Sequence, residues 1–350
     1  MPNTIDLYST RRMLEVLEQI PPQPKFLRNT FFRNVKQSDT DTIDIDIVKQ
    51  GRRVTAYTRP VLQGTLMERG GFETKSYKMP TIKIKMASGA DKFMTRSAGE
   101  TPYTLETPAQ RAARALVDDE AYLNGCLDAE EERQAAEVLS TGAITIRNDK
   151  GEAIQNIDFS LEASHKPVLT AADKWDDNSQ NFSTILAKCR AWRKIITRTG
   201  APAPTHMVVA SNVGELLIDK FNPPKEQSHI SSIRVDRGQV DITNLPDGVT
   251  YIGFFKELGC DIYSYDGTYL DLDNNVKPYI PDGKVILASA NARFDRNYAA
   301  IQNFHAGLMP VARFPWTWIE PDGRARFLQL ESAPLLAPHQ IDSIVAATVL

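Results

Sequence analysis

Residues 107–142, TPAQRAARALVDDEAYLNGCLDAEEERQAAEVLSTG, contain the clearest secondary-structure signal in this chain. Thr107 is a favourable N-cap, Pro108 fits the first helical position, and Gln110 completes a capping box with Thr107. The Ser-Thr-Gly sequence at 140–142 is typical of a helix end. A helix over 107–140 would be roughly 45–50 Å long at about 1.5 Å per residue. The pattern therefore predicts a spine along which other parts of the chain pack.

The predicted spine helix has an apolar stripe and an acidic run. The stripe consists of apolar residues at helical spacing, namely Ala109, Ala112, Ala113, Leu116, Leu123 and Leu127. The acidic run comprises Asp128, Glu130, Glu131 and Glu132. Because runs of like charge usually face water, we expect this run to form a solvated face of the helix.

The N-terminal segment predicts a short helix on a separate arm. Residues 8–20 have an apolar stripe made of Met13, Leu14, Leu17 and Ile20. Three prolines within 21–24 then favour an extended linker. A short helix beyond such a linker cannot bury its apolar side alone, so we expect it to dock on another surface.

Two stretches on either side of a glycine-containing segment alternate strictly between apolar and charged residues. They are IDIDI at 43–47 and IKIKM at 82–86, and both predict strands with one charged, solvated face. The surrounding segment 50–95 has few large core-forming residues, which predicts a long projecting hairpin. Because an isolated hairpin is marginally stable in water, we expect it to lean on a neighbouring subunit.

The remainder of the chain mixes short helices and strands without a regular βαβ repeat, which predicts the α+β class. A hairpin is expected over 143–161, because Asn-Asp-Lys-Gly at 148–151 separates two strand-like runs. The next expected elements are a helix over 180–198, a buried strand over 206–210, a helix over 212–221 and a flexible loop over 223–240. From residue 249 onward we expect short strands at VTYIGFF, CDIYSY, KVILAS, ARFLQL and SIVAATVL.

No sequence pattern predicts catalysis, a cofactor or a bound metal. GGFETKS at 70–76 lacks the glycine before the lysine that a phosphate loop needs, and DLDNN at 271–275 lacks the glycine and glutamate of a calcium loop. Cys126, Cys189 and Cys260 are far apart, and we expect each to be buried. The net charge of −3 argues against a general attraction to nucleic acid. No apolar run is long enough to cross a membrane.

Several short motifs resemble the major capsid proteins of lambda-like tailed bacteriophages, in the same order and over essentially the whole chain. The family's C-terminal tail is matched by ARFPWTW at 312–318, ARF at 325–327 and LESAPLL at 330–336. Further motifs are matched by FLRNTFF at 26–32, YTRP at 57–60, ERGG at 68–71, IPD at 280–282 and ASANAR at 288–293. The glycine that follows this last arginine in the family is absent, and residues 215–245 match no family motif.

The resemblance implies the capsid fold that tailed phages share with herpesviruses and encapsulins. The implied parts are an N-terminal arm and lead-in strand (1–47), an extended hairpin loop (48–97), a peripheral domain (98–189) with the spine helix (107–140), an axial domain (190–312) and a return to the peripheral domain (313–350). The implied function is self-assembly into hexamers and pentamers of an icosahedral procapsid and mature head around double-stranded DNA. The resemblance implies neither enzymatic activity nor a cofactor.

The resemblance also implies partners and a location. The partners are further copies of the chain, a portal protein, a scaffolding protein or protease, and a decoration protein. Packaged DNA would be contacted only non-specifically, and the acidic run of the spine would repel it if that face lined the shell. The location is the virion, assembled in the host cytoplasm and not on a membrane. An encapsulin-like nanocompartment shell and a cytosolic hydrolase with dispersed catalytic residues are the alternatives.

We expect contacts between subunits to come mainly from residues 1–35 and 50–95. The candidate contact residues are Met13, Leu17, Phe31, Phe32, Arg69, Phe72, Lys75, Tyr77, Lys83, Lys85 and Glu131. A further hypothesis pairs Lys83 or Lys85 with an acidic residue of a neighbouring subunit, which would be Asp44, Asp46 or Glu131.

Overall fold

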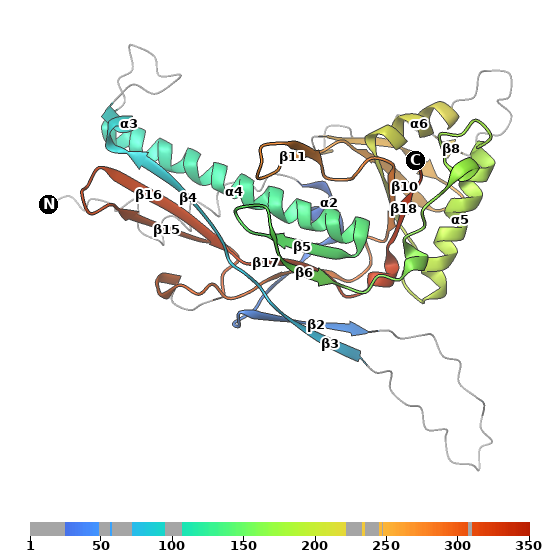
Figure 1. The fold of residues 1–350 in the computed structure, drawn as a ribbon, viewed down its shortest axis with the longest axis horizontal. Coiled ribbons are helices and arrows are strands. Elements are labelled where there is room, and N and C mark those ends of the chain that lie inside the picture. The colour runs from blue at the N-terminus through green and yellow to red at the C-terminus, as the bar shows by residue number, and fades with distance from the viewer. Residues whose placement is uncertain are drawn as a thin grey trace.

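The longest element is helix α4 (Pro108–Thr141), which crosses the molecule and contacts several of its sheets (Figure 1). The computed structural model describes residues 25–48, 57, 72–94, 107–221, 233–234, 245–246, 248–306 and 310–350. The capping box between Thr107 and Gln110 is present. The helix ends at Gly142, whose φ of 75° lies in the left-handed region that glycine adopts without strain. The predicted spine helix is therefore confirmed.

A six-stranded sheet forms one end of the molecule, on the right in Figure 1. In spatial order its strands are β18 (Val345–Thr348), β13 (Lys284–Ala288), β7 (His206–Ala210), β10 (Cys260–Tyr265), β9 (Val249–Phe255) and β8 (Ile233–Arg234). Strands β7 and β10 are parallel, and the other pairs are antiparallel. Nearby lie helices α5 (Phe182–Arg198) and α6 (Ser211–Phe221).

Two three-stranded sheets connect distant parts of the chain to the spine. The first contains β1 (Asn34–Gln37), β14 (Phe294–Tyr298) and β17 (Pro334–Pro338). The second contains β15 (Phe314–Ile319), β16 (Ala325–Ser332) and β4 (Ile82–Gly89). Alternate residues of β4 and β16 pack on Leu116, Leu123 and Leu127 of α4. These strand residues are Ile82, Ile84, Met86, Leu328 and Leu330. Part of the predicted apolar stripe of the helix is therefore buried by strands.

Three two-stranded hairpins also lie in the described part of the chain. They are β2 (Thr42–Val48) with β3 (Phe72–Lys78), β5 (Ala143–Arg147) with β6 (Ala153–Asp158), and β11 (Thr268–Leu270) with β12 (Val276–Pro278). The β2–β3 pair extends away from the body at the bottom of Figure 1. The short helices are α2 (Phe26–Phe31), α3 (Ala90–Met94) and the single turns Ala163–His165, Ala171–Asp173, Phe304–Ala306 and Ile341–Ser343.

The α+β class and most of the expected elements are confirmed. Helices α5 and α6, strand β7 and the β5–β6 hairpin lie where the sequence predicts them. In β2, Ile43 and Ile45 are buried and Asp44 is exposed, as the alternation indicates. The arm helix expected over 8–20 lies outside the described residues. So does most of the loop expected over 223–240, of which Ile233–Arg234 form β8.

Two expectations are wrong, one about strand β4 and one about Cys126. Strand β4 does not belong to the projecting hairpin, because its eight residues pair with β16 and its apolar side packs on the spine. The C-terminal strands β16, β17 and β18 all contact α4, and β18 also joins the six-stranded sheet beside β13; the return of residues 313–350 to the peripheral domain stays a prediction. Cys126 is exposed on α4, whereas Cys189 and Cys260 are buried as expected.

Candidate functional site

The acidic run of α4 is buried, which contradicts the expected solvated face. Asp128 is 2% exposed, and Glu131 and Glu132 are each 0% exposed. Burying three carboxylates costs several kcal/mol per ion unless cations and hydrogen-bond donors compensate them. Glu130 is the exception in the run, because it is partly exposed and pairs with Arg133 on the same helix. The other three are compensated by residues from distant parts of the chain, and together they form a charged junction.

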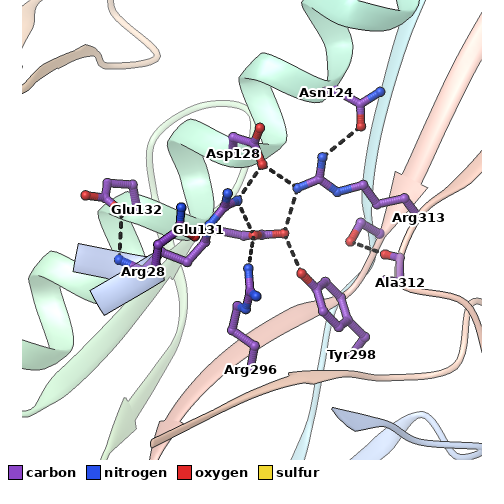
Figure 2. Close-up of polar contacts among 11 residues, drawn as sticks. Arg28, Asn124, Asp128, Glu131, Glu132, Arg296, Tyr298, Ala312 and Arg313 are labelled. Carbon is purple, nitrogen blue, oxygen red and sulfur yellow. Dashed lines mark hydrogen bonds and ion pairs between the residues drawn. The ribbon is translucent and has the colours of Figure 1, made fainter. Parts of the chain in front are cut away.

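Two arginines converge on Asp128 and Glu131 (Figure 2). Arg28 of α2 donates from Nη1 to Glu131 Oε2 at 2.7 Å and also to Asp128. Arg313, directly before β15, donates from Nη2 to Asp128 Oδ1 at 2.6 Å and to Glu131 Oε1 at 3.1 Å. Its Nη1 donates to Asn124 Oδ1 at 2.7 Å, one helical turn away. The two guanidinium groups therefore hold α2 and the start of β15 against the same stretch of the spine.

Strand β14 supplies the remaining contacts to Glu131. The Tyr298 hydroxyl donates to Glu131 Oε1 at 2.9 Å, and Arg296 Nη1 lies 4.0 Å from Oε2. Burial raises the pKa of the Tyr298 phenol, and the charge of Glu131 raises it further. Burial alone would lower the pKa of the Arg28 guanidinium, but Glu131 and Asp128 outweigh it and raise the pKa. The pKa of Arg313 is raised against burial by the same two carboxylates. The junction is therefore charged and internally neutralised.

Glu132 caps helix α2 from a different element. Its carboxylate oxygens accept hydrogen bonds from the backbone N–H groups of Leu27 and Arg28, each at 2.9 Å. These groups have no intrahelical partner in the first turn of a helix, and the N-cap residue Lys25 provides no side-chain cap. The Tyr265 hydroxyl of β10 donates to Glu132 Oε1 at 2.9 Å. Burial raises the pKa of Glu132, although these hydrogen bonds oppose the rise.

A further buried carboxylate, Asp295, attaches strand β1 to its sheet. Asp295 is 0% exposed, and its Oδ2 lies 2.5 Å from Lys36 Nζ and 2.9 Å from His339 Nε2. Asn34 Nδ2 donates to Asp295 Oδ1 at 3.2 Å. Burial would raise the pKa of Asp295, but the hydrogen bond from Lys36 and the charge of His339 outweigh it and lower the pKa. The segment after α2 is therefore also fixed by buried charge.

These buried charges hold distant parts of the chain together. Within the described ranges, no cluster of three or more His, Cys, Asp or Glu side chains is placed to hold a metal ion. No described helix is long and apolar enough to span a membrane.

The sequence from residue 9 to residue 349 matches the family model described as phage major capsid protein E. The chain belongs to this family. The major capsid proteins of Enterobacteria phage P21 and Escherichia phage lambda are each 24% identical to this chain. The alignment with the P21 protein spans 349 residues and that with the lambda protein spans 348. Each alignment covers 98% of this chain and 99% of the relative. The P21 prophage-derived major head protein of Escherichia coli O6:H1 strain CFT073 is also 24% identical over 349 residues.

Solved structures show the same fold. A prophage protein of E. coli CFT073, described as a capsid protein, superposes with a TM-score of 0.74 at 20% identity, covering 97% of this chain and 99% of that one. A phage-related protein from Bordetella bronchiseptica RB50 gives a TM-score of 0.51 at 10% identity, covering 97% and 96%. This member of the capsid protein E family therefore has the tailed-phage capsid fold.

Three of the candidate contact residues lie in the interior of the subunit. They are Phe31, Phe32 and Glu131. Phe31 is 1% exposed and Phe32 is 0% exposed. Phe32 stacks on Phe294 of β14 with 5.4 Å between ring centroids, and Phe31 meets His206 edge-on at 5.7 Å. Glu131 lies in the charged junction. The expectation that these residues contact a neighbour is wrong, because contacts within the subunit already enclose their side chains.

The candidate residues on β3 and β4 also have partners in their own subunit. Lys75 donates to Ser160 Oγ at 2.9 Å, and the Tyr77 hydroxyl donates to the Asp158 carbonyl at 3.3 Å. Lys83 Nζ lies 3.8 Å from Glu331, and Lys85 Nζ lies 5.6 Å from the centre of the Phe327 ring. A role for these partly exposed residues between subunits stays a prediction.

The remaining candidate residues are not placed by the structure. Met13, Leu17 and Arg69 lie outside the described residues, and of Phe72 only the backbone of β3 is described. Pairing of a neighbour's lysine with Glu131 is excluded by the burial of that carboxylate. Pairing with Asp44 or Asp46 stays a prediction.

The charged junction was missed because its members are spread from residue 28 to residue 313. One signal could have indicated it. Arg28 and Arg313 are single arginines inside the apolar motifs FLRNTFF and ARFPWTW. A lone arginine among residues that must be buried needs a buried carboxylate. One face of the spine helix offers three, namely Asp128, Glu131 and Glu132.

Proposed function

We propose that this phage capsid protein assembles into hexamers and pentamers that close an icosahedral shell, first a procapsid and then a mature head around double-stranded DNA. The main support is the match to capsid proteins along nearly the whole chain, in sequence and in fold. The role is structural, and the chain carries out no catalysis and needs no cofactor.

The shape of the subunit supports this assembly. The charged junction fixes α2, β14 and the start of β15 on one rigid helix. The β2–β3 hairpin pairs only with itself in the described sheets and extends beyond the body (Figure 1). A rigid body with a projecting element favours heterologous contacts, which form closed rings when the rotation between copies closes. Each contact can be weak, because every subunit in a closed shell is held at several interfaces.

The proposed partners follow from the same role. They are further copies of the chain, a portal protein, a scaffolding protein or protease, and a decoration protein. With a net charge of −3, the subunit is expected to contact DNA only non-specifically. Assembly is expected in the host cytoplasm, with the finished shell as part of the virion.

The test is to express the chain and image the product by negative-stain electron microscopy. Icosahedral shells or capsomer rings are the expected result, and a uniformly monomeric protein at high concentration would contradict it. Shells that co-purify with a cargo enzyme instead of DNA would indicate a nanocompartment.

The projecting hairpin is expected to contribute to assembly but not to folding. We therefore propose replacing residues 50–70 by a short Gly-Ser turn, which keeps β2 and β3. The variant should unfold at the same urea concentration as the parent and form few or no shells. A shortened β5–β6 turn, with residues 148–151 replaced by Asn-Gly, is the control and should still assemble. Normal shells from the hairpin variant would contradict the proposed role.

A further inference from the structure

Helix α5 carries positive charge without any negative charge of its own. Its 17 residues contain no Asp or Glu, although the chain as a whole has a net charge of −3. The basic residues of the helix are Lys188, Arg190, Arg193, Lys194 and Arg198. The helix buries its apolar residues, among them Ile185, Trp192 and Ile196, and lies at one end of the molecule beside the six-stranded sheet (Figure 1). Its other side therefore faces outward.

Two of the basic side chains are held by groups of their own subunit. Lys188 Nζ lies 3.1 Å from Asp173 Oδ1, and most of the lysine side chain is buried. Arg193 is half-buried, and its Nη1 donates to the carbonyl oxygen of Glu257 at 3.2 Å. These two residues attach α5 to the segments beside it.

The other three, Arg190, Lys194 and Arg198, are exposed and are called the basic face. Arg190 forms an ion pair with Glu257 in the turn after β9, but its side chain stays 52% exposed. Lys194 and Arg198 have no carboxylate partner among the residues that the structure describes. Lys256, in the same turn as Glu257, is also exposed, so this turn adds as much positive as negative charge. The basic face is therefore largely uncompensated.

Helix stability does not account for the basic face. Arg190, Lys194 and Arg198 follow one another at a spacing of four residues, and like charges at this spacing destabilise a helix. The helix dipole favours a cation only in the last turn, where Arg198 alone of the three lies. An anion outside the subunit would relieve the repulsion along the face.

The dimensions and chemistry of the basic face fit a phosphate backbone. Arg190 and Arg198 are separated by about 12 Å along the helix axis, which corresponds to roughly three phosphates of one DNA strand. The exposed residues between and before them, such as Thr184, Ala187 and Ala191, are small. The face therefore lacks the large aromatic or apolar anchors on which interfaces between proteins depend. Long cationic side chains on a smooth surface suit contacts that read charge and not sequence.

We propose that the basic face binds the phosphate backbone of duplex DNA, so that α5 faces the interior of the shell. This inference rests on the proposed function, which places duplex DNA inside the shell, and it names the surface that contacts this DNA. Because the chain is acidic overall, the basic face supplies a local site where the backbone is attracted.

The salt dependence of DNA binding tests the proposal. A short fluorescent duplex is titrated with the unassembled full-length chain from size exclusion, and anisotropy is followed at several salt concentrations. Neutralisation of three phosphates predicts a roughly 40-fold loss of affinity between about 50 and 200 mM salt. The same result is expected for duplexes of unrelated sequence. No binding at the lowest salt concentration would overturn the proposal.

A pair of double variants assigns the binding to the basic face. Lys194→Gln combined with Arg198→Gln should weaken binding and reduce the slope of log affinity against log salt concentration by about 2. Arg33→Gln combined with Lys150→Gln removes the same charge at two exposed positions elsewhere and should keep the slope of the parent. Equal losses in the two double variants would mean that only net charge matters, and would overturn the assignment.

A third double variant separates charge from folding. Lys194→Arg combined with Arg198→Lys keeps both charges and should bind DNA like the parent. All three double variants should unfold at the urea concentration of the parent, because the substituted side chains are exposed. Loss of binding in the charge-keeping variant would mean that the phosphates are not held by charge alone, and would overturn the proposal.

Electron microscopy distinguishes failure of this inference from failure of the proposed function. The Lys194→Gln, Arg198→Gln variant is expected to form shells like the parent, because its defect concerns only DNA. Loss of shells with unchanged DNA affinity would assign the basic face to contacts between proteins and overturn the inference. A parent chain that binds DNA through this face but forms no shells would contradict the proposed function instead.

Discussion

At the scale of single residues, the charged junction is the feature on which this subunit depends most. Arg28 and Arg313 are compensated by Asp128 and Glu131, and no member of the set is more than slightly exposed. A buried ion pair adds little compared with well-packed apolar residues, but the loss of one partner leaves an uncompensated buried charge. Substitutions in the junction should therefore be far more damaging than substitutions of exposed charges.

Arg28→Met tests this directly. The variant keeps the length of the side chain and removes one cation from Asp128 and Glu131. It should lower the free energy of unfolding by about 3–5 kcal/mol, measured by urea denaturation. Arg33→Met is the control, because Arg33 is exposed and donates to the Thr30 carbonyl. It should change stability by less than about 0.5 kcal/mol. Equal losses in the two variants would contradict the role of the junction.

Glu120 lies on the same helix, one turn before Asn124, and lacks such compensation. It is 1% exposed, and neither carboxylate oxygen has a hydrogen-bond partner among the described residues. Burial raises the pKa of Glu120 to about 7 from an ordinary value of 4.5. The folded protein therefore binds this proton more tightly than the unfolded chain does. Protonated Glu120 therefore stabilises the folded state. This stabilisation is complete below about pH 4.5 and is lost as the pH rises through about 7.

Glu120→Gln should remove this pH dependence. At pH 8 the variant should be more stable than the parent by on the order of 2 kcal/mol, and near pH 4 the two should be equal. The measurement is urea unfolding from pH 4 to pH 8. Glu320→Gln, at an exposed carboxyl, should follow the parent across the range. A constant difference between Glu120→Gln and the parent at all pH values would refute the assignment.

At the scale of elements, the spine helix depends on how it ends. Gly142 adopts a positive φ and lies against Leu161 of the segment after β6. A Cβ atom at this position would lie 2.4 Å from Leu161 Cβ, which is too close for both to keep their places. The end of α4 therefore sets the position of the β5–β6 hairpin that follows it.

Gly142→Ala and Gly151→Ala separate the clash from the backbone strain. Gly151 has a similar φ of 79°, but a Cβ there would meet no atom within 4 Å. Gly151→Ala should cost about 1 kcal/mol from strain alone. Gly142→Ala should cost about 1–3 kcal/mol more because of the clash with Leu161. Thermal unfolding measures both, and equal losses would mean that Leu161 moves aside freely.

At the scale of the whole molecule, long-range contacts join segments from both ends of the chain. Arg28, Asp128, Arg296 and Arg313 meet in the charged junction. Strand β4 also pairs with β16, which lies more than 200 residues later in the chain. Such contacts make the body one mechanical unit from which the β2–β3 hairpin projects (Figure 1). Assembly should therefore occur between rigid bodies, through non-covalent contacts.

Purified shells should accordingly separate completely when boiled in detergent. The expected result is a single band at 39.1 kDa, the mass of one chain. Lys75 and Lys83 near the hairpin are already held by groups of their own subunit, at Ser160 and Glu331. A ladder of bands at multiples of this mass would show covalent links between subunits and contradict the expectation.

The sequence by itself determined the features that depend on neighbouring residues. The capping box at Thr107, the stop at Gly142 and the alternation in IDIDI and IKIKM are local signals, and each predicted its element. The order of short motifs along the chain indicated the capsid family. Only the tertiary structure decided that the acidic run is buried and that β4 belongs beside the spine. The physical reason is that a carboxylate is stable in the interior only next to its cations, and here these come from residues about 100 and 180 positions away.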